Sequence, residues 1–142
     1  MFIESVPWLI IKIGQINWIA VYNLKDKNYT GRMLMESLVH LVNYMSRRFN
    51  LVIKRPRFNS ETKLTTYEID LNDLGLELCI SPSGIHVGRI ERTIRHFKDR
   101  FRCMKYDLPY NLNSKYIVYL VREIAFIINH TSDGTALTPF EY

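Results

Sequence analysis

The sequence predicts an α/β fold in which a mixed sheet is flanked by helices. Its composition is that of a globular domain, with 47% apolar and 23% charged residues over 142 positions, enough to bury a substantial core. Its apolar residues alternate between strand-like and helical spacing, in the order strand, strand, helix, strand, helix, strand, helix, helix. No internal repeat or linker divides the chain, so we interpret residues 1–142 as a single domain.

The opening residues are predicted to form an antiparallel meander. Residues 2–13 suit one strand, or two half-strands bent at residues 5–7, where a proline cannot donate to a strand ladder. Residues 14–15 resemble a turn, and residues 17–24 are rich in the aromatic and β-branched side chains that favour a second strand. The polar residues 25–30 leave room for a short third strand.

A helix is predicted to begin at Thr30 or Gly31 and to end near Arg48, because its leucines recur at helical spacing. The apolar residues 51–54 follow at once and are interpreted as a short strand. Because this strand follows a helix directly, we expect the helix to be the crossover to a parallel strand. The next residues, 55–63, are predicted to form a loop.

Two short elements precede the most basic part of the chain. Residues 67–74 are predicted to form a short helix that ends at Gly75, since glycine favours the end of a helix. Residues 76–80 are predicted to form a short apolar strand, and residues 81–84 a loop.

The segment from Gly84 to Met104 is predicted to be a helix with an apolar stripe and a cationic surface. The stripe consists of Val87, Ile90, Ile94, Phe97, Phe101 and Met104. The basic residues on its other faces are Arg89, Arg92, Arg95, Lys98, Arg100 and Arg102. Residues 81–105 hold seven basic and two acidic residues, a net charge of +5 that equals the net charge of the whole chain. This helix is therefore the main candidate for contact with a polyanion.

The last predicted element is a helix capped by Asn113 or Ser114 that runs to about Asn129. It is apolar on most of its faces, so we expect it to be heavily buried. Residues 133–142 are predicted to form a loop. No apolar run approaches the roughly 20 residues that a membrane span needs, so no membrane partner is expected.

Five strings, in this order and spacing, carry a family resemblance: SVPWLI, RRFNLVIK, SPSGIHVGRIERTIRHFKDRFR, LPYNLNSKYIVYLV and TPFEY. They resemble the integrase catalytic core of retroviruses and LTR retrotransposons, an RNase H-like fold, and they cover nearly the whole chain. The resemblance implies DNA integration by polynucleotidyl transfer. In that chemistry three acidic residues hold two divalent ions, Mg²⁺ or Mn²⁺, that activate a nucleophile and stabilise the leaving oxygen.

The resemblance places the third acid of the family on Glu91. The position of the first acid lies upstream of Met1, so we expect a truncated core whose first half-strand is partly missing. Aligning the Phe58–Asn59 pair with a similar pair of the family places Arg55 at the second acid, and a cation there repels a metal ion. We therefore expect a degenerate core with no metal cofactor, in which Glu91 is vestigial. The alternative for Glu91 is a solvated carboxylate paired with Arg95.

The resemblance also implies that the helix face of Glu91, Arg95 and Lys98 meets a DNA end. The predicted nucleic-acid-binding residues are Arg89, Arg92, Arg95, Lys98, Arg102, Arg55 and Arg57. The last two belong to a second cluster, residues 47–57, which has five basic residues and no acid. The rest of the chain has 7 basic and 12 acidic residues, so the cations are gathered on two segments. The alternative is that these cations form a solubilising surface.

We interpret the chain as a degenerate retroelement integrase-like core that binds nucleic acid. DNA is the expected partner, and the expected location is intracellular, in the nucleus if the family's role is retained. The alternative is a protein-interaction module derived from an integrase core, in which the apolar last helix forms a homodimer.

Overall fold

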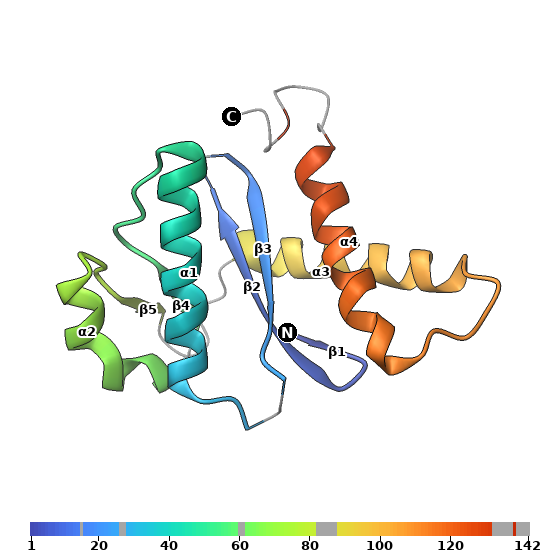
Figure 1. Ribbon diagram of the computed structural model, residues 1–142, viewed down its shortest axis with the longest axis horizontal. Coiled ribbons are helices and arrows are strands. Elements are labelled where there is room, and N and C mark those ends of the chain that lie inside the picture. Colours follow the sequence, from blue (N-terminus) through green and yellow to red (C-terminus); the bar gives the residue numbers. More distant parts are fainter. Residues whose placement is uncertain (15, 26–27, 60–61, 82–87, 132–137, 139–142) are drawn as a thin grey trace. The chain divides into compact units, whose positions relative to one another are not determined.

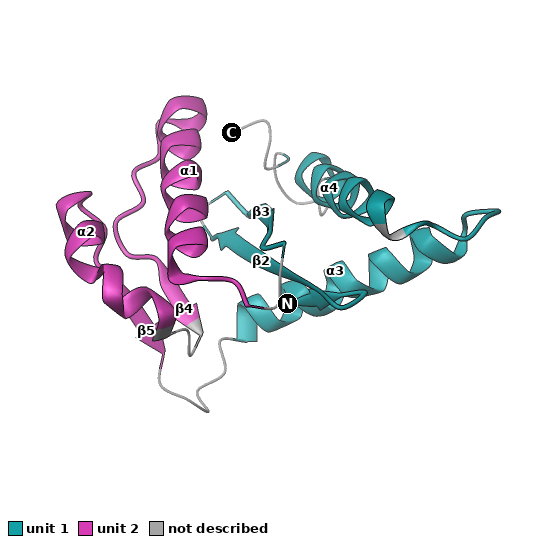
Figure 2. Cartoon of the chain, turned by 60° about the horizontal axis from the view of Figure 1, so that its bottom comes forward, with its two compact units in different colours: residues 1–25, 88–142 teal, residues 26–87 magenta. Residues whose placement is uncertain are grey.

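The computed structural model describes all residues except 15, 26–27, 60–61, 82–87, 132–137 and 139–142 (Figure 1). The chain divides into two compact units (Figure 2). The first unit contains residues 1–25 and 88–142, and the second contains residues 26–87. No described helix combines the length and apolarity that crossing a membrane requires.

The sheet of the first unit is an antiparallel meander of β1 (Phe2–Ile3), β2 (Val6–Ile13) and β3 (Trp18–Asn23), in the order β1-β2-β3. The long ladder pairs Ile10 with Val21 and Ile13 with Trp18. The antiparallel meander is therefore confirmed. Among the described residues of the 25–30 segment, none forms the third strand for which the sequence left room.

A continuous strand over residues 2–13 is a wrong prediction, because the chain reverses direction at Glu4 and Ser5. Both residues have positive φ, 49° and 65°. Two consecutive residues of this kind form the tight hairpin turn whose twist matches that of paired strands. The two half-strands therefore lie side by side, with Phe2 opposite Pro7 and Ile3 opposite Val6, and are not joined by a bend.

Two helices cover this sheet: α3 (Gly88–Tyr106) and α4 (Ser114–His130). In the first unit α3 packs on β2 and α4, and α4 packs on β3 (Figure 1). The shared core contains Trp8, Ile10, Ile19, Phe97, Phe101, Ile117, Val121 and Ile124. The predicted helical stripe is confirmed at Phe97 and Phe101, while Gly84–Val87 at its start lie outside the described residues.

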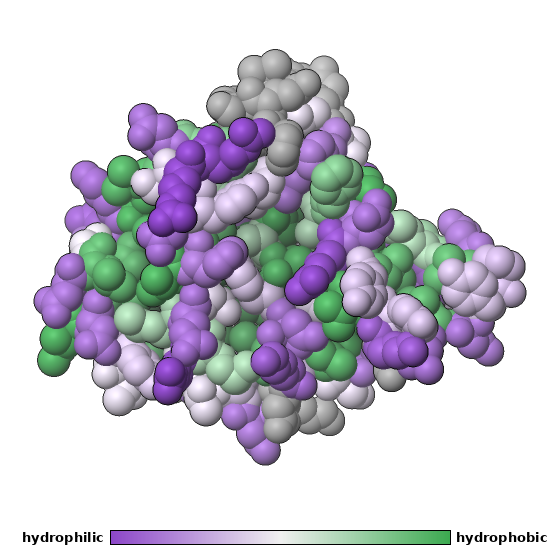
Figure 3. All heavy atoms as spheres, viewed as in Figure 1, coloured by the Kyte–Doolittle hydropathy of each residue, from purple (hydrophilic) through white to green (hydrophobic). Residues whose placement is uncertain are grey.

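The predicted cap of α4 is confirmed, since Asn113 Oδ1 accepts a hydrogen bond from the Lys115 backbone N–H at 3.2 Å. The prediction that α4 is buried on most faces is wrong at three aromatic residues. Tyr116, Tyr119 and Phe126 are 47%, 65% and 55% exposed. They occupy the side of α4 that its packing on α3 and β3 leaves uncovered, and Figure 3 shows apolar side chains at the surface over this helix.

A buried polar contact ties the end of α4 to the sheet. The Asn129 side chain is 4% exposed. Its Oδ1 accepts from the Ile19 backbone N–H, and its Nδ2 donates to the Ile19 carbonyl oxygen, both at 2.8 Å. Both polar atoms of the side chain are hydrogen-bonded. An asparagine is therefore tolerated at a buried position of α4 that would otherwise require an apolar side chain.

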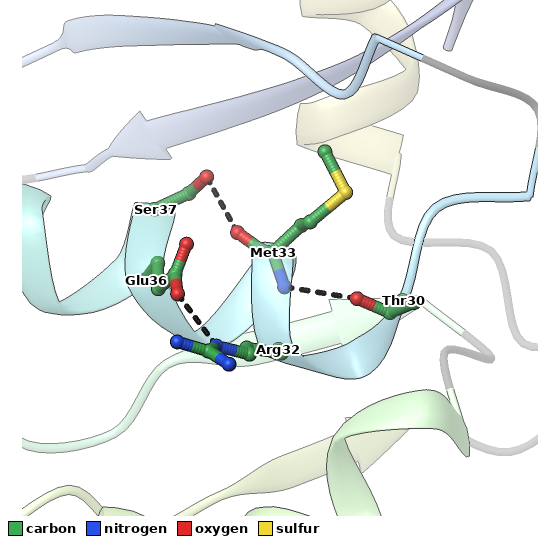
Figure 4. A network of polar contacts seen from close by, with 5 residues as sticks. All are labelled: Thr30, Arg32, Met33, Glu36 and Ser37. Carbon is green, nitrogen blue, oxygen red and sulfur yellow. Dashed lines mark hydrogen bonds and ion pairs between the residues drawn. The ribbon is translucent and has the colours of Figure 1, made fainter.

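The second unit begins with α1 (Gly31–Phe49), whose predicted start is confirmed by Thr30. Thr30 Oγ1 accepts from the Met33 backbone N–H at 3.4 Å, and Ser37 Oγ donates to the Met33 carbonyl at 2.8 Å (Figure 4). Gly31 is needed at the first position for steric reasons. An added Cβ would lie 2.2 Å from the Lys63 carbonyl oxygen, closer than atoms can approach.

The remaining elements of the second unit are β4 (Arg57–Asn59), the 3₁₀ helix η1 (Thr62–Tyr67), α2 (Glu68–Asp73) and β5 (Cys79–Ser81). β4 and β5 pair in parallel, with Phe58 opposite Ile80. The predicted helix near residues 67–74 and the strand near 76–80 are therefore confirmed, with shifted bounds. The α/β class with antiparallel and parallel pairing is also confirmed, although the described strands form two sheets and not one.

The predicted strand at residues 51–54 is wrong, and so is the loop predicted at Arg57–Asn59. Two isolated hydrogen bonds already align residues 54–56 with the chain at β5. The Glu77 N–H donates to the Lys54 carbonyl at 2.8 Å, and the Cys79 N–H donates to the Pro56 carbonyl at 3.1 Å. Pro56 has no N–H to return a bond, so a continuous ladder begins only after it. The crossover between the observed parallel strands is η1 and α2, not α1.

Candidate nucleic-acid interface

The buried side chains of α3 fix the direction of its cations. Thr93, Phe97 and Phe101 are buried. At about 100° per residue, the other side chains fall on the two flanks of this stripe. One flank carries Glu91, Arg95, Lys98 and Arg102, which we call the Glu91 side. The opposite flank carries Arg89, and Arg92 lies on the exposed side between the two flanks.

The Glu91 side of α3 is hollowed into a shallow depression. Its lining residues are Glu91, Ile94, Arg95, Lys98, Asp99 and Arg102. Arg102 Nη1 lies 3.1 Å from Asp99 Oδ1 in an exposed salt bridge. Within the described residues Arg95 forms no salt bridge, so the alternative pairing of Glu91 with Arg95 is not found. The predicted face of Glu91, Arg95 and Lys98 is therefore one surface, with a positive charge on each of the turns that follow Glu91.

Glu91 lies in the first turn of α3, as predicted. The residue is partly exposed and takes part in an interaction. Among the described residues, no group of three or more His, Cys, Asp or Glu side chains is arranged to hold a metal ion.

The far end of α3 is fastened to the sheet by a charge pair that the sequence did not reveal. Lys105 Nζ lies 2.6 Å from Glu4 Oε1, in the β1–β2 turn. The pair spans 101 residues and both side chains are part-exposed, so its contribution to stability is small. It removes Lys105 from the set of cations available to an anionic partner.

A lysine outside the predicted set, Lys12, lies near Arg89 and Arg92. Lys12 of β2 is partly buried, and its pKa is lowered from 10.5 by that burial, then by the positive charges of Arg89 and Arg92. Arg89 reaches the β2–β3 turn, where its guanidinium Nη1 lies 4.0 Å from a Cβ placed on Gly14. We call these three residues the Lys12 cluster.

Replacing Lys12 with methionine is expected to stabilise the protein at neutral pH. The change removes charge repulsion and keeps the apolar part of the side chain, and like-charge contacts at such sites cost less than about 1 kcal/mol. The melting temperature should rise by up to about 3 °C, measured by calorimetry. An unchanged or lower melting temperature would show that the three charges do not repel one another.

The lowered pKa of Lys12 also predicts a pH dependence. Below the lowered pKa both states hold the proton, so stability does not change with pH. Above it the native state loses the proton first and the unfolded state binds more protons, so stability rises until the pH reaches about 10.5. The difference in unfolding free energy between the Lys12→Met variant and the parent should therefore shrink as the pH approaches 10.5.

The second predicted cluster, residues 47–57, lies in the second unit. Arg55 Nε lies 2.6 Å from Glu77 Oε2, and both side chains are exposed. Arg57 begins β4. The Arg55 charge is therefore partly compensated by Glu77, a partner 22 residues away that local sequence patterns cannot identify.

The fold is similar to that of solved integrase structures. The crystal structure of the catalytic core domain of BIV integrase matches with a TM-score of 0.72 and 14% sequence identity, covering 97% of this chain and 85% of that chain. A chain of the cryoEM structure of the simian T-cell lymphotropic virus intasome, in complex with PP2A regulatory subunit B56 gamma, matches with a TM-score of 0.76 and 13% identity. That match covers 97% of this chain and 49% of that chain.

These two likenesses confirm the predicted RNase H-like fold of an integrase catalytic core. No protein-family model matches the sequence, and no curated protein matches it either.

Proposed function

We propose that this chain is an integrase-like core that binds the phosphate backbone of DNA through the Glu91 side of α3 and does not carry out polynucleotidyl transfer. The observation that carries the proposal is the set of six cations on α3 other than Lys105. Within the described residues, Arg102 is the one member of this set with a salt bridge. Over the whole of α3 seven basic residues stand against two acidic ones, and such an excess of positive charge attracts phosphate and releases its counterions.

The geometry of α3 favours a polymer over a small anion on this side. Arg95 and Lys98 follow Glu91 by four and seven residues, and Arg102 follows by eleven, so three cations extend along about two turns of one flank. The shallow depression between them is open, which suits the edge of an extended backbone. Such contacts position a nucleic acid without reading its sequence.

Loss of catalysis is proposed because of Arg55. The family resemblance places the second metal-binding acid at this position. A guanidinium cannot replace a carboxylate as a ligand of a hard divalent cation. The observed pairing of Arg55 with Glu77 gives the arginine a role in charge compensation within the second unit. If the family's role in DNA binding is retained, this protein acts in the nucleus.

A second candidate function is homodimerisation through α4. Tyr116, Tyr119 and Phe126 give this helix an exposed aromatic side, with ring centroids of the two tyrosines 6.4 Å apart. Phe126 also stacks on His130 at 3.9 Å. Exposed aromatics of this kind are typical of protein interfaces. This candidate needs no cation on α3.

Duplex binding separates the two candidates. The proposed function predicts weak duplex binding, with a dissociation constant of about 10⁻⁴ to 10⁻⁶ M that changes little with DNA sequence. The affinity should fall steeply between about 50 and 200 mM salt. Fluorescence anisotropy with two unrelated duplexes measures it, and sedimentation at the same salt concentrations measures self-association. A dimer that is insensitive to salt, together with no duplex binding at low salt, would replace the first candidate with the second.

With Mg²⁺ or Mn²⁺ the purified chain is expected to show neither nicking nor strand transfer, because the resemblance places Arg55 at a required metal-binding position. Supercoiled plasmid reports nicking, and a labelled oligonucleotide reports strand transfer. The Glu91→Gln variant is the matched control, since it removes one charge and keeps the shape. Metal-dependent nicking by the parent that Glu91→Gln abolishes would overturn this prediction.

A further inference from the structure

Lys12 occupies a position on β2 where the strand pattern requires an apolar side chain. Alternate residues of a strand share a face, and Trp8 and Ile10, two positions apart, are both buried in the core with Phe97 and Phe101 of α3. Lys12 is the next residue on that same face. A cation therefore stands at the end of an apolar row that is directed at α3.

The neighbours of Lys12 make this position more unusual. Its nearby charges are the guanidinium groups of Arg89 and Arg92, which add to the effect of burial. Within the described residues, no carboxylate forms a salt bridge with any of the three. Folding thus gathers three positive charges, one of them partly withdrawn from water, without a described counter-charge. Such an arrangement is unfavourable by itself and becomes favourable when an anion is bound between the charges.

The cluster differs from the surface on which the proposed function rests. Arg89 lies on the flank of α3 opposite to Lys98, with the buried stripe between them, while Arg92 lies on the exposed side of the helix, three residues before Arg95. The two groups of cations also differ in how their charges are arranged. The Glu91 side is an extended row that includes two carboxylates, whereas the Lys12 cluster converges from two elements, β2 and α3.

We propose that the Lys12 cluster binds a phosphate group, and that it favours a terminal phosphate monoester over a backbone diester. Two guanidinium groups and one ammonium group supply forked and rotatable N–H donors, a combination that suits a tetrahedral oxyanion. A monoester carries nearly two negative charges at neutral pH and a diester carries one, so three cations are better balanced by the monoester. The same chemistry is offered by free phosphate and by the 5′-phosphate of a DNA end.

Inorganic phosphate is the first probe, used with the full chain. At constant ionic strength, replacing chloride with phosphate should raise the melting temperature of the parent, because an anion that binds only the native state stabilises it. The rise should be absent in Lys12→Met and in Arg92→Gln and should be retained in Lys12→Arg, which keeps the charge. Lys98→Gln, on the opposite flank, removes the same charge and should leave the rise intact.

A duplex with either 5′-phosphate or 5′-hydroxyl ends is the second probe. The parent should bind the phosphorylated duplex about tenfold more tightly, the effect of one charge-assisted contact. Lys12→Met and Arg92→Gln should remove this preference. Lys98→Gln should weaken the binding of both duplexes equally. A phosphate-induced rise without the duplex preference supports the site and identifies free phosphate as its ligand.

The proposal is overturned if the parent shows neither effect, or if both effects persist in Lys12→Met and Arg92→Gln. This failure is distinguishable from failure of the proposed function. A parent that binds both duplexes equally, in a salt-dependent manner, and does not respond to phosphate would retain the Glu91 side as a DNA surface and lose the Lys12 cluster as a site.

Discussion

Replacing Phe97 with alanine is expected to lower the free energy of unfolding by about 3–5 kcal/mol. The Phe97 side chain is 0% exposed and lies in the core that α3 shares with β2 and α4. Truncation removes the burial of an aromatic ring and leaves a cavity that the surrounding side chains fill only in part. Because domains are stable by only about 5–15 kcal/mol, a large fraction of the population should unfold in mild denaturant.

Urea denaturation followed by circular dichroism measures this loss. Phe126→Ala is the matched control, because it deletes the same ring from a position on α4 that is 55% exposed. Substitutions at such a surface position usually change stability by no more than about 0.5 kcal/mol. Equal losses in the two variants would mean that α3 is not held to the sheet by the stripe that the sequence predicts.

The long helices could be predicted because their information is local. The apolar stripes of α1 and α3 depend on spacing within one segment, and the caps Thr30 and Asn113 are side chains that accept hydrogen bonds from their own helices. The Glu91 side followed from the same spacing. Once the buried stripe of α3 was assigned, the directions of Arg95 and Lys98 were fixed.

The predicted bounds of the strands were wrong where the contact that determines them is with another segment of the chain. Apolar residues 51–54 have the composition of a strand, yet the ladder begins at Arg57 because Pro56 cannot donate to β5. At Glu4 and Ser5 the turn lacks the glycine or asparagine that normally marks a reversal with positive φ, so no residue there indicates a hairpin.

The Lys12 cluster could not be predicted, because it depends on how β2 packs on α3. Lys12 and Arg89 are 77 positions apart, and no local pattern joins them. One signal was available in the sequence. Lys12 interrupts an alternating apolar row that begins at Trp8, and a charge at such a position has to be explained by what it faces. Asn129 is a similar case, since its partner Ile19 is 110 residues away.

The largest expected effect on binding is that of removing Arg95 and Lys98 together. Each lost phosphate contact should lower the slope of log K against log salt by about 0.9, so the Arg95→Ala/Lys98→Ala variant should have a slope flatter by roughly two units. Stability should barely change, because exposed cations contribute little to folding. The Lys115→Ala/Arg122→Ala variant is the control, since it removes the same net charge from α4.

A salt titration of the parent and these two variants against one duplex tests whether the Glu91 side of α3 contacts DNA phosphate. We expect a slope flattened by roughly two units in Arg95→Ala/Lys98→Ala and a nearly unchanged slope in Lys115→Ala/Arg122→Ala. The same slope in all three proteins would show that this side of α3 does not contact phosphate and would direct the search to the cations of residues 47–57.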